Sequence, residues 1–242
     1  MSTRIALITG GNRGIGLETA RQLGQQGVHV IVGARGAAAG EQAAATLKGE
    51  GVAAESVVID VADSASVHAA AAAIDARHGR LDILVNNAGV LGEMVAGPSA
   101  QTLAQWREVF DTNLFGLIEV TQAMLPLLHR SDAGRIVNVS SVLGSIALHG
   151  QPGSPIYEMK GIPAYNVSKS AVNAWTVQLA YELKASRIKV NTIHPGYVKT
   201  EMNRGGGELE VPEGARTSVA MALITDDGPS GSFTHLGETL PW

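Results

Sequence analysis

The sequence predicts an α/β protein built on a parallel sheet, with about seven strands along the chain. Short apolar runs alternate with longer helical patterns along the chain, and this alternation is typical of βαβ units. The first apolar run also leads directly into a glycine-rich turn and a helix. No linker divides the chain and no repeat appears, so we expect a single domain over residues 1–242.

Composition narrows the classes of function. The 242 residues carry a net charge of −4 without a block of basic residues, so we expect no nucleic-acid partner. The absence of cysteine excludes disulfides and thiolate chemistry. No apolar stretch approaches the roughly 20 residues that span a bilayer, and the first strand begins near Arg4, which leaves no room for a signal peptide. We therefore expect a cytoplasmic protein without a membrane partner.

The predicted elements follow one another in a regular order. Strands are expected at residues 5–9, 28–35, 54–59, 81–85, 134–141 and 188–193, with a last short one at 232–235. Helices are expected at residues 15–26, 37–49, 64–78, 102–130, 165–186 and 211–224. Residues 144–163 show little periodicity and carry three prolines, which predicts a functional or mobile segment.

The turn after the first strand reads Gly-Gly-Asn-Arg-Gly-Ile-Gly at residues 10–16. Gly10 would permit the tight turn, Gly14 a close approach of ligand to backbone, and Gly16 the packing of helix against strand. The following helix would offer free N–H groups and a partial positive charge to a phosphate. Leu17 stands where a nucleotide-triphosphatase loop needs lysine. An ordinary glycine-rich turn is the alternative.

The end of the second strand indicates which dinucleotide would bind. An acidic residue there would bind the ribose 2′-hydroxyl of NAD, but this chain has Ala34 followed by Arg35. The guanidinium groups of Arg13 and Arg35 could together clamp a 2′-phosphate, which points to NADP(H). Two surface arginines are the alternative. Asp60 could accept a hydrogen bond from the adenine amino group or cap the next helix, for which Asp63 and Ser64 are better placed.

Tyr165 and Lys169 lie four residues apart in a predicted helix and so share one face. A free tyrosine has a pKa of about 10, and a neighbouring ammonium favours the phenolate. Lowering that pKa to about 7 takes roughly 4 kcal/mol, most of which one close cation in a partly dry site could supply. Such a tyrosine could exchange a proton with a substrate oxygen near neutral pH. The same spacing is common on solvated surfaces. The histidines have no metal-ligand spacing, and we predict no metal site.

Together these motifs resemble the short-chain dehydrogenase/reductase family over nearly the whole chain. The resemblance rests on residues 9–16, Asp60-Val61, residues 86–89, Asn113, Ser141, Tyr165 with Lys169, and Pro195-Gly196. Residues 137–141, the insertion before Tyr165 and the Trp242 ending look most similar to the carbonyl-reductase branch, which generally uses NADPH. The resemblance implies a Rossmann-type fold, in which a doubly wound sheet of about seven parallel strands carries helices on both faces.

It also implies a proton-relay tetrad. Tyr165 would be the acid and base, and Lys169 would lower its pKa and bind the nicotinamide ribose. Ser141 would hydrogen-bond the substrate carbonyl; it is chosen over Ser140 because the family's serine precedes x-x-Gly. Asn113 would hold a water that links Lys169 to solvent. The implied contacts to NADP(H) are Gly10, Asn12, Arg13, Gly14, Ile15, Gly16, Arg35, Asp60, Val61, Asn87, Ala88, Gly89, Tyr165, Lys169, Pro195, Gly196, Val198 and Thr200.

The implied reaction is NADPH-dependent reduction of a ketone or aldehyde. An NAD-linked alcohol dehydrogenase of the same fold and a non-catalytic NADP(H) sensor are the alternatives. Tyr165 follows Ser141 by 165 − 141 = 24 positions, about twice the family's usual interval. This insertion leaves open whether the protein is a monomer or a homo-oligomer. Few residues separate Thr200 from the helix expected at 211, and we expect an open site for bulky carbonyl compounds.

Overall fold

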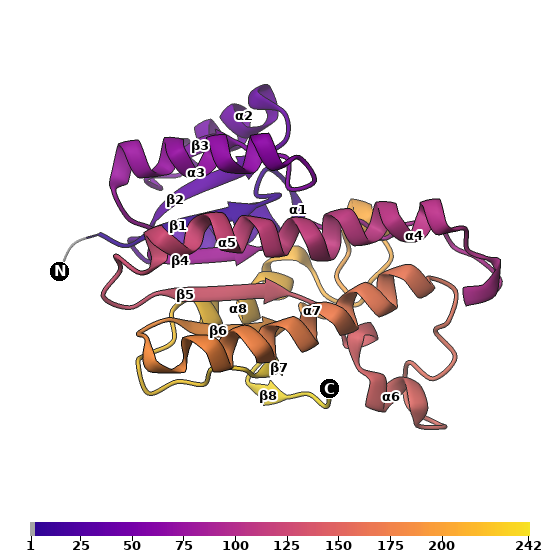
Figure 1. Ribbon diagram of the computed structural model, residues 1–242. Helices are drawn as coiled ribbons and strands as arrows, with labels where there is room; N and C mark the ends of the chain where they lie inside the picture. The colour runs from indigo at the N-terminus through magenta and orange to yellow at the C-terminus, as the bar shows by residue number, and fades with distance from the viewer. Residues whose placement is uncertain (1–2) are drawn as a thin grey trace.

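The computed structural model describes residues 3–242, which form one eight-stranded sheet with helices on both faces (Figure 1). The strands are β1 (Ile5–Thr9), β2 (His29–Ala34), β3 (Ala54–Val58), β4 (Ile83–Asn86), β5 (Arg135–Val139), β6 (Lys189–Ile193), β7 (Phe233–His235) and β8 (Glu238–Thr239). Their order in the sheet is β3-β2-β1-β4-β5-β6-β7-β8, and only the β7–β8 pair is antiparallel. The predicted doubly wound α/β fold is confirmed. β8 was not predicted, because two residues are too few to show a strand pattern.

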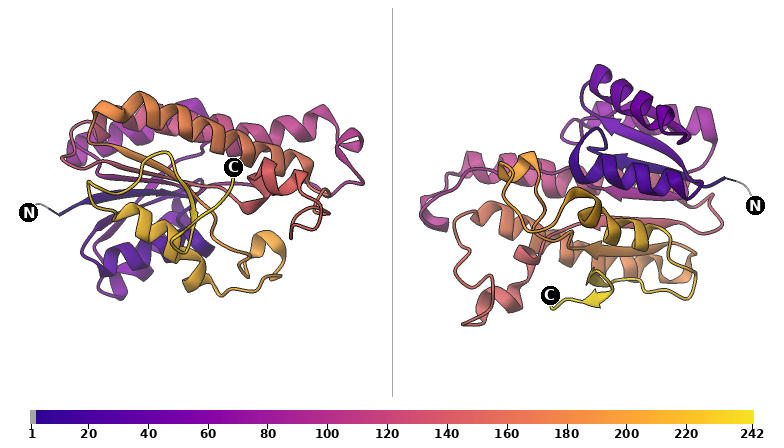
Figure 2. Two further views of the ribbon diagram at one scale, coloured as in Figure 1. Left: turned by 90° about the horizontal axis from the view of Figure 1, so that it is seen from below. Right: turned by 180° about the vertical axis from the view of Figure 1, so that it is seen from behind.

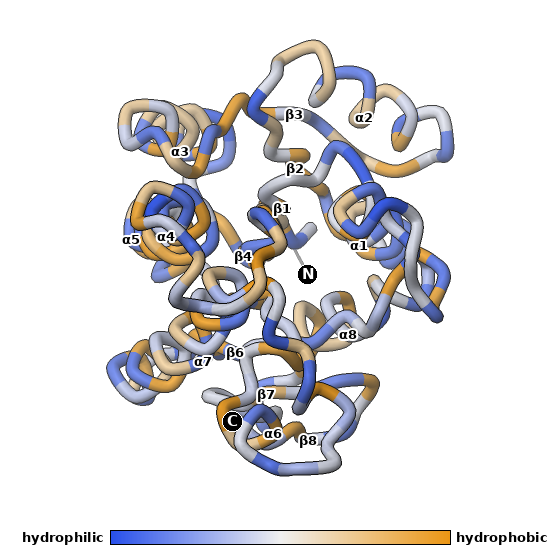
Figure 3. The backbone as a smooth tube through the Cα atoms, turned by 90° about the vertical axis from the view of Figure 1, so that its right-hand side faces the viewer, coloured by the Kyte–Doolittle hydropathy of each residue, from blue (hydrophilic) through white to orange (hydrophobic). Residues whose placement is uncertain are grey.

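The helices form two layers. On one face lie α1 (Gly14–Gln25), α2 (Ala37–Gly49) and α8 (Val211–Ala222), and on the other lie α3 (Ser64–His78), α5 (Leu117–Leu128) and α7 (Pro163–Glu182). Figure 3 shows the layers end-on, with α3, α5 and α7 on one side of the strands and α1 and α8 on the other. The view from behind in Figure 2 places α1 and α8 together in front of the sheet.

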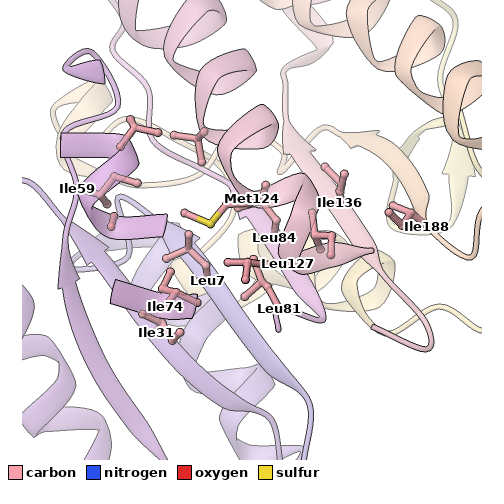
Figure 4. Packing of buried hydrophobic residues seen from close by; sticks show 14 of the residues in the cluster. Leu7, Ile31, Ile59, Ile74, Leu81, Leu84, Met124, Leu127, Ile136 and Ile188 are labelled. Atoms are coloured by element: carbon pink, nitrogen blue, oxygen red, sulfur yellow. The ribbon is translucent and has the colours of Figure 1, made fainter. Parts of the chain in front are cut away.

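The core consists of two apolar layers, one under each set of helices. Leu7, Ile31 and Leu84 point from three neighbouring strands toward Met124 of α5, and all four side chains are fully buried (Figure 4). Alternate residues of the same strands pack against the other helices, as Ile8 does beside Leu23. Each such burial stabilises the fold by about 1.5–3 kcal/mol. Because parallel strands are covered on both faces, they appear in the sequence as continuous apolar runs.

The long helix expected at 102–130 is interrupted. It consists of α4 (Leu103–Phe110), a π-helical turn η2 (Asp111–Gly116) and α5. Thr102 begins α4 with a capping box completed by Gln105. Asn113 lies in the π-helical turn, and its side chain forms a hydrogen bond outside the helix, which accounts for a residue of low helix propensity at this position.

The segment between β5 and α7 contains more structure than expected. It forms η3 (Val142–Gly144) and the short helix α6 (Ile146–Gly150), which projects from the body of the protein in Figure 1. Lys160 Nζ donates to the carbonyl oxygen of His149 at 2.9 Å, and Val95 N donates to Gly161 O at 2.9 Å. The first contact closes this segment on itself, and the second ties it to the segment that follows β4. Three further 3₁₀ turns are η1 (Pro98–Ala100), η4 (Leu183–Ala185) and η5 (Glu201–Asn203).

Across residues 3–242, none of the helices combines the length and the apolar character that crossing a bilayer requires.

Candidate active site

The glycine-rich turn between β1 and α1 has the geometry that its sequence predicts. Gly10 and Gly14 have φ values of 60° and 53°, a region that glycine enters without strain. A Cβ atom on Gly16 would lie 2.4 Å from both Gly10 O and Asn87 Nδ2, so a larger residue does not fit. Asn87 Nδ2 donates to Thr9 O at 2.9 Å and thereby ties the turn to the end of β4. The first N–H groups of α1 therefore lie beside the carboxyl ends of β1 and β4.

A cleft of about 750 Å³ opens above this turn. Its lining includes the predicted residues Gly10, Asn12, Arg13, Gly14, Ile15, Gly16, Arg35, Asp60, Val61, Asn87, Ala88, Gly89 and Thr200. Pro195, Gly196, Val198, Tyr165 and Lys169 are not part of this lining. Lys199, Glu201, Met202, Val90 and Thr112 line it without having been predicted. Residues 199–202 reach the cleft because the chain folds back there, and no local pattern signals such a return.

The predicted 2′-phosphate clamp has an unexpected partner. Arg13 forms an ion pair with Glu201, and both side chains are well exposed. Arg35 is exposed at the same cleft. Asp60 Oδ1 accepts from Ala62 N at 3.1 Å, whereas Asp63 caps α3 by accepting from Ala65 N at 3.0 Å. Asp63 therefore caps the helix, and Asp60 remains in the cleft wall.

The residues of the predicted tetrad come from three elements and meet at the carboxyl end of β5. Lys169 is buried in α7, and its Nζ donates to Val139 O at 2.7 Å. The same Nζ lies 5.6 Å from the centre of the Tyr165 ring. Ser141, two residues beyond β5, forms a hydrogen bond with the Tyr165 side chain. Asn113 is fully buried in the π-helical turn. The structure therefore brings the tetrad together.

The two candidate serines have different partners. Ser140 Oγ donates to the backbone oxygen of Lys169 at 3.3 Å, so this hydroxyl fixes α7 against β5. Ser141 is the serine whose side chain reaches Tyr165. Close packing helps to align this group, because a Cβ atom on Gly144 would lie 2.8 Å from the backbone carbon of Lys169. The geometry favours Ser141 as the hydroxyl beside Tyr165.

Asn113 is held by the backbone after β4. Its Oδ1 accepts from Val90 N at 2.8 Å, and its Nδ2 donates to Val90 O at 2.9 Å and to Ser168 Oγ at 3.1 Å. The tetrad meets the cleft at Gly89, where a Cβ atom would lie 3.2 Å from Asn113 Oδ1 and 3.7 Å from Lys169 Nζ. Asn113 and Lys169 thus lie directly behind the part of the cleft wall that Gly89 forms.

Burial dominates the electrostatics of the pair. It raises the pKa of Tyr165, and the hydrogen bond to Ser141 partly offsets this. Burial also lowers the pKa of Lys169 to about 8. The expected lowering of the tyrosine pKa by its cationic neighbour is therefore wrong for this structure. The reason is that both groups are desolvated, and the ammonium is directed at Val139 O.

We expect the free energy of unfolding of the Lys169→Met variant at pH 7 to exceed that of the wild type by about 1–3 kcal/mol. The pKa of Lys169 is about 8 in the folded chain, against an ordinary value of 10.5. Below pH 8 both states carry the proton, so the folded state bears the full cost of a buried charge. Between pH 8 and 10.5 the folded state releases the proton and this cost disappears. Urea unfolding at pH 7 and pH 10 should show a gain that shrinks as pH rises; a variant less stable at pH 7 contradicts this account.

Comparison with known proteins agrees with the geometry. The family model described as short chain dehydrogenase matches residues 4–208. The chain belongs to the short-chain dehydrogenase/reductase family. A (+)-neomenthol dehydrogenase of Capsicum annuum is 33% identical over 306 aligned positions, which cover 98% of this chain and 97% of that protein. The family assignment made from the motifs is confirmed, and the protein is an oxidoreductase of this family.

Two solved structures of family members are similar throughout. Salutaridine reductase from Papaver somniferum superposes with a TM-score of 0.82 at 32% identity, covering 95% of this chain and 99% of that one. An NADPH-bound carbonyl reductase from chicken fatty liver superposes with a TM-score of 0.85 at 28% identity, covering 100% of both chains. The Rossmann-type sheet of this chain is therefore the arrangement that these short-chain dehydrogenase/reductases share.

Proposed function

We propose that this protein reduces a ketone or aldehyde to an alcohol with NADPH, with Tyr165 as the general acid. The observation that carries the proposal is the hydrogen-bonded Ser141–Tyr165 pair beside Lys169, placed next to a dinucleotide-sized cleft with Arg13 and Arg35 in its wall. The carbonyl reductase of similar fold that contains NADPH supports the choice of cofactor.

The residues of the cleft fit NADPH. The N-terminal end of α1 and the glycine turn would hold the pyrophosphate, and a Cβ atom on Gly16 would collide with the turn that forms this cradle. Arg13 and Arg35 would bind the 2′-phosphate. NADPH would supply the hydride, as nicotinamide cofactors do.

The chain's own side chains handle the carbonyl oxygen and the proton. Ser141 and Tyr165 would donate hydrogen bonds to that oxygen as negative charge develops on it. Tyr165 would then transfer its proton to the oxygen. A raised pKa keeps the Tyr165 hydroxyl protonated at neutral pH, which suits a group that must donate. Lys169 would hold the ribose and stabilise the phenolate that forms.

The Arg35→Ala variant is expected to weaken NADPH binding about tenfold to a hundredfold, because charge-assisted bonds to a phosphate are worth about 1.5–3 kcal/mol. NADH lacks that phosphate, and its affinity should stay nearly constant. Fluorescence titration with both cofactors measures the effect. The control for the change in net charge is Arg216→Ala, which removes an exposed arginine from α8. Equal losses for NADPH and NADH would contradict the role of Arg35.

The Glu201→Gln variant is expected to bind NADPH about twofold to fivefold more tightly. Glu201 pairs with Arg13 and so competes with a 2′-phosphate for the same guanidinium. The amide keeps the shape of the side chain but removes its charge. The same titration checks this, and weaker NADPH binding by the variant would show that Glu201 assists the cofactor instead.

We also propose that the substrate is a bulky cyclic ketone. We expect the pocket walls to come from residues 92–94, 145–159 and 197–204, and these segments carry large, exposed apolar side chains: Met94, Ile146, Met159, Tyr197 and Met202. Two similar proteins are named for neomenthol and salutaridine, which are both cyclic compounds. The short segment after Thr200 supports an open site.

The test is the initial rate of NADPH and NADH oxidation with aldehydes, small ketones and bulky cyclic ketones. NADPH-dependent activity that is highest with the cyclic ketones is the expected result. A preference for NADH would favour the NAD-linked alcohol dehydrogenase. Tight NADPH binding without turnover of any carbonyl would favour the non-catalytic sensor. The choice between a monomer and a homo-oligomer stays open, and the cytoplasmic location stays a prediction.

A further inference from the structure

We propose that His29, Glu55 and His78 form a binding site for a divalent transition-metal ion, with Zn²⁺ as the ion that fits best. The three residues lie far apart in the sequence, but their ligand atoms all lie within 4.8 Å of one another. No spacing motif joins them, so sequence analysis predicted no metal site.

The topology explains why these side chains meet. His29 is the first residue of β2, and Glu55 lies near the start of β3. Glu55 is the register partner of Ile31 in the parallel β2–β3 pair. His29 is two residues before Ile31 and therefore points to the same face of the sheet. That face is covered by α3, and His78 is the last residue of this helix. The two strand starts and the helix end thus place one ligand each.

The distances suit a small metal ion. His29 Nε2 lies 3.6 Å from Glu55 Oε1, and His78 Nε2 lies 2.5 Å from the same oxygen. Ligand atoms around tetrahedral zinc lie about 3.3 Å apart, given metal–ligand distances of about 2.0–2.1 Å. Opening the His78–Glu55 contact by about 0.8 Å would bring this pair to the spacing of two zinc ligands.

His29 gives an independent reason to expect a ligand. Its Nε2 atom is buried and has no hydrogen-bond partner within the described part of the chain. Buried polar atoms without partners are rare, because each costs the free energy of its lost hydration. A metal ion between His29 and Glu55 would satisfy this nitrogen.

The surroundings also fit. Arg77 Nη1 donates to the other oxygen of Glu55 at 2.9 Å, which orients the carboxylate and leaves Oε1 for the metal. The side chains of His29, Glu55 and His78 are 27%, 23% and 18% exposed, so the ion has a path from solvent and water can complete its coordination. Two imidazoles and one carboxylate are ligands typical of zinc, while copper and nickel bind the same donors.

This site is separate from the cofactor cleft. It lies at the amino ends of β2 and β3, whereas Arg35 and Asp60 in the cleft follow the carboxyl ends of the same strands. A bound ion would join two strands to the end of α3, and we expect it to stabilise the fold without changing the rate of carbonyl reduction.

The experiment is a titration of the tag-free full-length chain, stripped of metal, with ZnCl₂ in competition with a chromogenic chelator. We expect one equivalent of zinc to bind. Both His29→Gln and His78→Gln should lose at least tenfold in affinity, while the matched control His129→Gln, at an exposed histidine of another helix end, should keep it. At free zinc a hundredfold above the dissociation constant, the wild type should melt about 5–10 °C higher, and the variants should not.

His29→Gln keeps the test decisive, because the nitrogen it removes has no hydrogen bond whose loss would unfold the chain. Circular dichroism melting without metal verifies that each variant is folded. Cobalt(II) should give absorption bands of a four- or five-coordinate nitrogen–oxygen site in the wild type alone. Zinc binding that survives both substitutions, or no binding by the folded wild type, would overturn the proposal.

Discussion

Tyr165→Phe is expected to reduce the turnover number for carbonyl reduction by about 10²–10⁴-fold, because the substitution removes the proton donor. The rest of the site should persist. The ring, which lies 5.6 Å from Lys169 Nζ, keeps its place, and the residues of the glycine turn are untouched. NADPH affinity should therefore remain within about threefold of the wild type, since the substitution removes one hydroxyl outside the cleft lining. Steady-state kinetics with a cyclic ketone and fluorescence titration with NADPH measure the two quantities.

The matched control is Tyr181→Phe, which removes a hydroxyl from an exposed tyrosine of the same helix. Its turnover number should equal that of the wild type. A Tyr165→Phe enzyme that turns over at the rate of this control would show that another group supplies the proton.

Arg135→Met is expected to lower the free energy of unfolding by about 2–4 kcal/mol. The Arg135 side chain is only 3% exposed. It donates to Ile224 O at 2.9 Å, to Gly134 O at 2.9 Å and to Asp226 Oδ1 at 2.7 Å. Methionine fills similar space but leaves carbonyl groups buried without these donors. Urea unfolding followed by circular dichroism measures the loss.

Asp226→Asn separates the charge from the hydrogen bonds. Arg135 holds the pKa of the Asp226 carboxyl below its ordinary value, but this carboxyl is mostly exposed to solvent. We therefore expect only a small change in the unfolding midpoint. If Asp226→Asn destabilised the protein as much as Arg135→Met, the ion pair rather than the backbone contacts would be what stabilises this corner of the fold.

The cofactor cleft was largely predictable because its residues are local. The glycine turn, the end of β2 and residues 87–89 each follow a strand directly, and parallel strands end at a common edge. Tyr165 and Lys169 were paired by their spacing in a helix, and Asn113 and Ser141 came from the family resemblance; the structure places the four together. What each residue does in catalysis stays a prediction.

The remaining features depend on packing between distant segments. Glu201 reaches Arg13 because residues 199–202 fold over the cleft, and His29, Glu55 and His78 meet through strand register. The direction of the Tyr165 pKa was wrong because spacing along a helix shows which charges are neighbours but not how far water is excluded from them. α6 and β8 are too short to leave a periodic signal.

The π-helical turn at Asp111–Gly116 has a consequence for how this chain tolerates length changes. Such a turn holds one residue more than an α-helical turn, so the faces of α4 and α5 are rotated relative to each other by about 100°. The outer part, α4, can therefore contact α7 while the inner part, α5, keeps its own orientation against the sheet. Removing one residue between 111 and 116 would restore a regular helix, yet it would turn Leu103–Phe110 away from its neighbours and withdraw Asn113 from Val90. The extra residue thus rotates α4 relative to α5, so that one continuous helical segment packs against two surfaces of different orientation.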